Sequence, residues 1–158
     1  MNKQLQQKII QAKDIDQKTR IACKSDKLTM KNYIVYLIDL VNNDLIKNII
    51  KKHSYPTQKM IGKKGMQAFW LLIQHQDNDI KLQEQCLKHC DFEDKNKAFL
   101  TDRVLVSKGK KQLYGTQFYR DKKGKIVPRS INNLSQLNKR REKVGLEPFE
   151  EYLKKMQK

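Results

Sequence analysis

Three polar segments of the sequence carry the residue types from which binding and catalytic sites are made. They are residues 74–79 (QHQDND), 101–103 (TDR) and 112–117 (QLYGTQ). Each segment borders apolar residues of the kind that fill a core, so its titratable and amide groups are brought to the edge of a buried surface. This placement predicts a polar pocket, although the residue types alone assign no reaction to it.

His75 and Asp77 could form an acid–base pair. An imidazole titrates near neutral pH, and a neighbouring carboxylate fixes which ring nitrogen carries the proton. His75 also lies at the C-terminal end of a predicted helix, where an imidazole can instead interact with the free carbonyl groups of the last turn. The sequence leaves both interpretations open.

Arg103 suits an anionic ligand, because a guanidinium can bind a phosphate or carboxylate through two parallel hydrogen bonds. Asp102 directly precedes it on a predicted helix, so the two side chains point in different directions and do not form an i,i+4 pair. We interpret Asp102 mainly as a structural partner in an ion pair between helices.

Residues 114–117 (YGTQ) offer a phenol, a backbone that a ligand can approach closely, a hydroxyl and an amide. In a strand, Tyr114 and Thr116 would share one face and Gly115 and Gln117 the other, so only one pair could line a pocket. The competing interpretation places Tyr114 in the core and lets Gln117 pair across a hairpin.

We therefore predict a pocket that binds or acts on an anionic or amide-bearing ligand. In a catalytic version, His75 would be the general acid or base, Arg103 or Arg141 would stabilise negative charge, and Tyr114 or Gln117 would orient the substrate. The predicted catalytic residues are His75, Arg103 and Tyr114, and the predicted ligand-binding residues are Asp77, Gln117 and Arg141.

Basic residues concentrate at the two ends of the chain. The sequence has 34 Lys and Arg against 17 Asp and Glu, a formal charge of +17. Basic and acidic residues number 12 and 5 in residues 1–60, 7 and 7 in residues 61–107, and 15 and 5 in residues 108–158. The excess favours acidic or polyanionic partners, whereas His75 and Asp102 lie in the neutral middle, so we interpret charge and pocket as separate features.

The main alternative function is a non-enzymatic basic module that binds RNA, DNA or an acidic protein. Its contacts would come from the predicted hairpin and C-terminal helices, through Lys122, Lys123, Arg140 and Arg141. No known recognition motif accompanies these charges. A second alternative is a structural subunit of a larger assembly.

The cysteines and the apolar runs bear on location and cofactors. Three cysteines without an apolar leader favour a reducing compartment, and we predict a cytoplasmic protein. The longest apolar run, residues 33–38, is far too short to cross a bilayer, so no membrane partner is predicted. Cys86, His89 and Cys90 lack a fourth ligand of the kind zinc needs, so we predict neither a metal nor another cofactor.

Hydrophobic periodicity predicts a mainly α-helical fold: a single compact domain of five to seven helices with a small β-hairpin. The first helix has an apolar stripe of Leu5, Ile9, Ala12, Ile15 and Ile21. The predicted helices are residues 2–24, 31–53, one opening at Gly62 and Gly65, 80–90 with Asp79 as N-cap, 94–106, 132–144 and 148–156. The hairpin strands are predicted at residues 113–119 and 125–129. The single domain, residues 1–158, would comprise a peripheral N-terminal helix (2–30), a helical core (31–107), the hairpin (111–130) and C-terminal helices (132–157).

Several motifs occur in the order seen in a family of small bacterial domains of unassigned function, which this chain resembles. The motifs are Tyr55-Pro56-Thr57, WLLIQH at residues 70–75 with Asp77, LTDR at residues 100–103, Gly109 and Gln112 with YGTQ at residues 114–117, and Arg140-Arg141 with GLxP at residues 145–148 and EYL at residues 151–153. The match covers roughly residues 40–155. It departs from the family pattern at Ser54-Tyr55, where Gly-Trp is usual, and at Gln76, where Ala is usual. The resemblance implies a shared, mainly helical fold and a shared polar site, and it supplies no activity.

Overall fold

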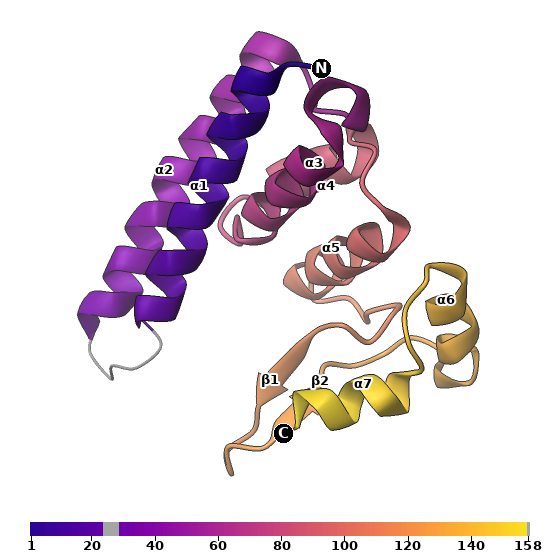
Figure 1. The fold of residues 1–158 in the computed structure, drawn as a ribbon. Helices are drawn as coiled ribbons and strands as arrows, with labels where there is room; N and C mark the ends of the chain where they lie inside the picture. Colours follow the sequence, from indigo (N-terminus) through magenta and orange to yellow (C-terminus); the bar gives the residue numbers. More distant parts are fainter. Residues whose placement is uncertain (24–28, 158) are drawn as a thin grey trace. The chain divides into compact units, whose positions relative to one another are not determined.

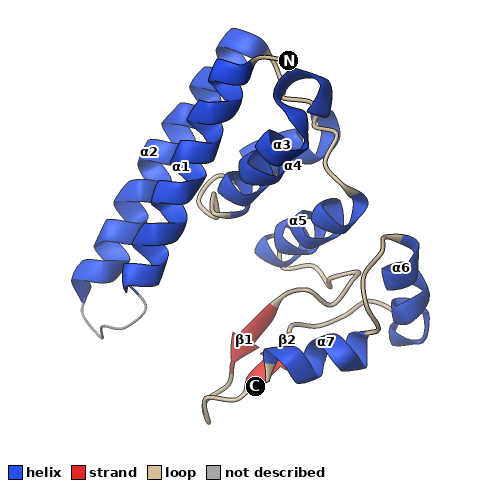
Figure 2. Cartoon of the chain, viewed as in Figure 1, coloured by secondary structure: helices blue, strands red, loops and turns tan. Residues whose placement is uncertain are grey.

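The computed structural model describes residues 1–23 and 29–157, and in these residues it contains seven α-helices, a short 3₁₀ helix and one two-stranded β-hairpin (Figures 1 and 2). The predicted fold class, mainly α-helical with a small hairpin, is confirmed. The chain divides into two compact units, an N-terminal unit of Met1–Phe92 and a C-terminal unit of Glu93–Lys158. The fifth helix, which we grouped with the helical core, belongs to the C-terminal unit.

The N-terminal unit contains four helices, α1 (Lys3–Ala22), α2 (Thr29–His53), α3 (Gln58–Gln74) and α4 (Ile80–His89). Residue 24, the last one predicted for the first helix, and residues 25–28 of the predicted N-terminal segment 2–30 lie outside the described part of the chain. Helices α1 and α2 run side by side (Figure 1), and α1 also packs against α3. Side-chain caps begin three of the helices: Asn2 accepts from Leu5 N, Thr57 from Met60 N, and Asp79 from Leu82 N. The predicted Asp79 cap is thus confirmed.

The core of this unit is assembled from all four helices. Its fully buried apolar side chains include Ile9, Ile46, Ile61, Phe69, Leu72, Ile73 and Cys86. Helix α3 is kinked at Gly62, which has φ +67°. A Cβ there would lie 2.8 Å from Gln6 Nε2, whose amide donates to Ile61 O, so glycine is needed both for the conformation and for this contact.

Helices α1 and α2 expose part of the apolar surface that periodicity assigned to the core. Ile15 is 55% exposed and Ile21 65% exposed, whereas Asp16 is completely buried. The predicted apolar stripe is therefore wrong at its C-terminal end, where a carboxylate takes the inward position. On α2 the exposed large apolar side chains are Tyr33, Ile34, Tyr36, Leu37, Leu40 and Val41.

The C-terminal unit begins with α5 (Asp94–Ser107), continues through the hairpin strands β1 (Phe118–Arg120) and β2 (Ile126–Pro128), and ends with the 3₁₀ helix Leu134–Gln136, α6 (Leu137–Lys143) and α7 (Phe149–Met156). The strands are antiparallel, with Tyr119 opposite Val127. Asp121 closes the turn by accepting from Lys123 N and Lys125 N. The hairpin is confirmed, but β1 begins at Phe118 and not at the predicted Leu113.

None of the described helices combines the length and the apolar content needed to span a membrane.

Gly115 should be the least replaceable glycine of the C-terminal unit. It has φ +69°, and an added Cβ would lie 2.7 Å from the Phe149 ring. We expect Gly115→Ala to lower the free energy of unfolding by about 2–3 kcal/mol, through overpacking and backbone strain together. Urea denaturation of the full chain measures the loss.

Gly124→Ala is the matched control, because Gly124 has φ +78° and no atom within 4 Å of the added Cβ. Only the conformational cost, about 1 kcal/mol, should appear. Equal losses in the two variants would show that Phe149 does not press against Gly115.

Candidate functional site

The N-terminal unit holds a buried carboxylate beside an imidazole. Asp16 lies on the inward face of α1 and is 0% exposed, and His75 follows the last turn of α3. His75 Nδ1 is 2.8 Å from Asp16 Oδ2, within ion-pair distance, although the hydrogen-bond angle is poor. Because a carboxylate offers only acceptors, this contact favours a proton on Nδ1 and leaves Nε2 as the free nitrogen of the neutral ring.

Asp16 is surrounded by donors from its own helix and from α2. Arg20 Nε lies 3.2 Å from both carboxylate oxygens, and Gln17 Nε2 donates to Oδ2 at 2.8 Å. Asn42, buried on α2, donates to Oδ1 at 3.4 Å. Burial raises the pKa of the Asp16 carboxyl, but His75, Arg20 and Gln17 together outweigh it and leave that pKa below its ordinary value. Asp16 is therefore a charged group at neutral pH.

Arg20 also joins Asp16 to a second carboxylate, since its Nη2 donates to Asp39 on α2. Burial raises the pKa of Asp39 and outweighs the opposing attraction of Arg20. Ligand atoms of Asp16, Asp39 and His75 lie within 4.8 Å of one another, which is close enough to hold a metal ion. The Arg20 guanidinium already contacts both carboxylates, so it fills the electrostatic role that a cation would take.

A cavity of about 160 Å³ adjoins this cluster and is lined by His75. Gln76, Asn78 and Asp79 form another part of its wall, so much of the predicted polar segment 74–79 faces one space. Asn43 and Lys47 contribute from α2. Asn43 Nδ2 donates to Gln76 Oε1 at 3.1 Å, and Lys47 Nζ lies 2.8 Å from Asp79 Oδ2. The cavity therefore presents an imidazole, amides and charges of both signs.

The predicted site residues lie in both units. His75 and Asp77 belong to the N-terminal unit, where Asp77 is exposed in the turn after α3. Arg103, Tyr114, Gln117 and Arg141 belong to the C-terminal unit, where Arg103 is half-buried on α5. The structure brings Tyr114 and Arg141 together, because Arg141 Nη1 donates to Tyr114 O. His75 is held instead by Asp16, which we did not predict.

The C-terminal unit is organised by Asp102, which is completely buried on α5. Its carboxylate accepts from the backbone N–H groups of Leu113, Tyr114 and Thr116 at 2.7–3.1 Å and from the Thr116 hydroxyl at 3.0 Å. Residues 113–117 are therefore a loop wrapped around a carboxylate, and the alternating faces predicted for a strand do not exist. The structural role that we assigned to Asp102 fits this geometry, with backbone amides in place of a second charged side chain.

Gln112 and the two adjacent arginines complete this network. Gln112 donates to Gln117 O and Arg129 O, and its Oε1 accepts from Gln117 N. Arg140 donates to Leu113 O, Asn132 O and Asn133 O. Arg141 is 1% exposed, donates to Glu147 O at 2.7 Å and lies 4.9 Å from the centre of the Tyr152 ring. Burial lowers the pKa of Arg141 and outweighs the nearby negative groups. The guanidinium groups of Arg140 and Arg141 thus both donate hydrogen bonds to backbone carbonyl groups of this unit.

Sequence reasoning missed Asp16, Arg20, Asp39 and Lys47. Asp16 had a readable signal, because the spacing Leu5, Ile9, Ala12, Asp16 continues the inward face of one helix. A charged residue at an inward position needs a partner. Lys47 had no comparable signal.

Asp16→Asn should weaken the fold in a pH-dependent way. We expect a loss of about 1–3 kcal/mol at pH 7, because the buried hydrogen bonds lose their charge assistance. The folded pKa of Asp16 is lower than the unfolded one, so its contribution is complete above the ordinary value of 3.8 and disappears as the pH falls through the folded value. Urea denaturation between pH 7 and pH 2 should show the two proteins converging in acid.

Asp14→Asn is the control, since the Asp14 side chain is 48% exposed and pairs with the neighbouring Lys13. It should change stability by less than about 0.5 kcal/mol. A constant difference between wild type and Asp16→Asn over the whole pH range would contradict the assignment.

Asp102→Asn should be more damaging than any exposed substitution, because an amide NH₂ would face backbone N–H donors. We expect a loss of about 3–5 kcal/mol. Asp94→Asn on the same helix, where the side chain is 73% exposed, should cost less than about 0.5 kcal/mol. Similar losses in the two variants by chemical denaturation would rule out the proposed role of Asp102.

Comparison with curated proteins and with solved structures gave no match. Residues 3–158 match a sequence family whose description is a family of unknown function, DUF6624. The match includes both units and every motif of the resemblance noted above. The resemblance to a family of unassigned function is confirmed, and the chain is a member of DUF6624.

Proposed function

We propose that the N-terminal unit binds an anionic or amide-bearing ligand at His75 and that His75 acts on it as a general acid or base. The observation that carries this proposal is the 2.8 Å contact of His75 Nδ1 with a buried carboxylate, beside a cavity that His75 lines. Asp16 orients the ring and leaves Nε2 for proton exchange with the ligand.

The remaining groups of the cavity support binding of a polar ligand. Asn43, Gln76 and Asn78 supply amide donors and acceptors, which suit a carbonyl, hydroxyl or amide group. At about 160 Å³ the cavity is smaller than the roughly 300–1,000 Å³ of typical ligand pockets. It therefore suits the reactive group of a ligand better than a whole molecule.

The reaction would take place in the cytoplasm. All three cysteines, Cys23, Cys86 and Cys90, are free thiols, which fits a reducing compartment. Cys86 and Cys90 are buried, and their mutual contact and burial raise the pKa of the Cys86 thiol. This favours a role in packing for Cys86 and not metal binding.

The alternative functions have less support. Of the four residues suggested for nucleic-acid binding, Arg140 and Arg141 are engaged with backbone carbonyls, and Lys122 and Lys123 are exposed in the hairpin turn. Nucleic-acid binding by a basic module would therefore depend on Lys122 and Lys123. A subunit of a larger assembly is favoured by the exposed apolar side chains of α2, since such patches mark partner surfaces.

Ligand-observed NMR with a panel of small carboxylates, amides and phosphate esters tests the proposal. We expect members of the panel to bind the wild type and to lose at least about tenfold in affinity in His75→Gln, because the oriented imidazole that contacts the ligand is gone. His53→Gln is the control, since His53 is exposed and lines a different cavity.

Thermal unfolding of both variants separates a lost site from a lost fold. Unchanged binding in His75→Gln with a clearly reduced midpoint would assign His75 a structural role and overturn the proposal. Equal losses of affinity in His75→Gln and His53→Gln would also contradict it.

A further inference from the structure

A larger cavity adjoins the His75 cavity within the N-terminal unit. It has a volume of about 450 Å³ and lies between α2, α4 and the turn that carries Tyr55. Lys47 and Asp79 line both cavities, and their ion pair of 2.8 Å forms the wall that the cavities share. The two cavities are therefore neighbours, separated by the side chains of this ion pair.

The two cavities carry opposite charge. The larger one is lined by Lys47, Lys51 and Lys81 against the single carboxylate Asp79, which leaves a charge of +2. The His75 cavity is lined by Asp39 and Asp79 against Lys47, which leaves −1 when the imidazole is neutral. An anionic group is therefore attracted more strongly to the first cavity than to the second.

Two of the three lysines of the larger cavity, Lys51 and Lys81, are available to a ligand. Within the part of the chain that the structure describes, Lys51 and Lys81 form no ion pair, and both side chains are exposed. The other walls include Ile50, Leu82 and the half-buried ring of Tyr55, which stacks on His89 at 4.6 Å. The charged lysine side chains thus lie beside an apolar surface that the carbon skeleton of a ligand can contact.

We propose that this lysine cavity binds the phosphate group of a phosphate monoester whose other end reaches His75. A phosphate monoester carries about −1.5 to −2 charges near pH 7, which matches the +2 of the cavity, whereas a carboxylate or sulfate ester supplies only one charge. Lysine ammonium groups are common phosphate ligands. The volume of 450 Å³ falls within the range of small-molecule pockets. The placement of the other end of this ligand at His75 rests on the function proposed above.

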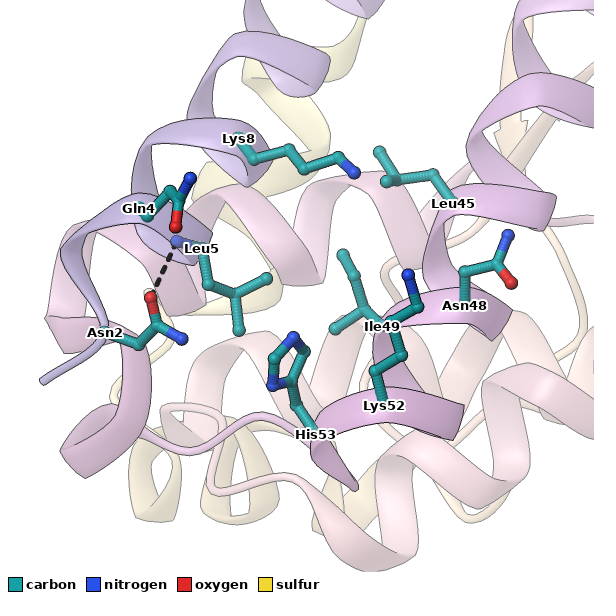
Figure 3. Close-up of a pocket in the computed structure, with 9 residues that line it drawn as sticks. All are labelled: Asn2, Gln4, Leu5, Lys8, Leu45, Asn48, Ile49, Lys52 and His53. Carbon is teal, nitrogen blue, oxygen red and sulfur yellow. Dashed lines mark hydrogen bonds between the residues drawn. The ribbon is translucent and has the colours of Figure 1, made fainter.

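A third cavity of the same unit provides a matched control. It has a volume of about 240 Å³ and contains Lys8 from α1 and Lys52 from α2, together with His53 (Figure 3). Among the described residues, no carboxylate lines it, and none of its lining residues belongs to the His75 cavity. It therefore offers two lysines without the adjoining imidazole–carboxylate pair.

Phenyl phosphate and phenyl sulfate, at constant ionic strength and pH 7.5, are suitable probes because they have similar shapes and different charges. We expect phenyl phosphate to bind the wild type at least about fivefold more tightly than phenyl sulfate, as measured by calorimetry and by shifts of the Lys81 and Leu82 amide signals. The double variant Lys51→Gln/Lys81→Gln should weaken phenyl phosphate binding about tenfold. Lys8→Gln/Lys52→Gln should leave it within twofold.

Equal weakening in the two double variants would reveal general attraction to a basic surface and overturn the proposal. Equal affinity for the phosphate and the sulfate would overturn it as well. Phenyl phosphate binding that depends on Lys51 and Lys81 but is accompanied by no ligand at His75 would support the phosphate site and count against the proposed function. Panel ligands that bind at His75, together with phenyl phosphate binding that is unchanged in Lys51→Gln/Lys81→Gln, would support the proposed function and overturn the phosphate site.

Discussion

The need to stabilise one buried charge, the carboxylate of Asp16, determines how the N-terminal unit is built. Moving a carboxylate out of water costs several kcal/mol unless donors replace the lost water. Here Arg20 on α1 and Asn42 on α2 donate hydrogen bonds, and His75 at the end of α3 lies within ion-pair distance. Satisfying Asp16 therefore fixes these helices relative to one another and turns His75 into an oriented group beside a cavity.

The C-terminal unit also contains a buried carboxylate, that of Asp102, but there most of the donors are backbone N–H groups. A loop of five residues, 113–117, carries backbone N–H groups that no helix or strand satisfies, and Asp102 accepts from three of them. Arg140 and Arg141 bind carbonyl groups of the same region. Four of the segments that carry the family resemblance thus meet in a structural network, which explains much of the pattern without any reaction.

Local signals in the sequence were enough to predict most elements. Pro56 and Gly145 mark helix boundaries, Asp79 is a side-chain cap, and the Asp121–Gly124 turn forms the hairpin. The strand predicted at residues 113–119 failed over residues 113–117, because Asp102, eleven residues before Leu113, offers those amides a better acceptor than a partner strand. The Asp16–His75 contact joins residues that are 59 positions apart, and only packed helices create it. The inward position of Asp16 had a signal in the sequence, but its pairing with His75 had none.

The tautomer of His75, read from the ¹⁵N chemical shifts and two-bond couplings of the imidazole, tests the central claim most directly. At a pH where the ring is neutral, the contact with Asp16 predicts that Nδ1 carries the proton and that Nε2 does not. In Asp16→Asn this preference should weaken. A neutral ring with its proton on Nε2, unchanged by Asp16→Asn, would contradict the account, because Asp16 would then not orient the group on which the proposed chemistry depends.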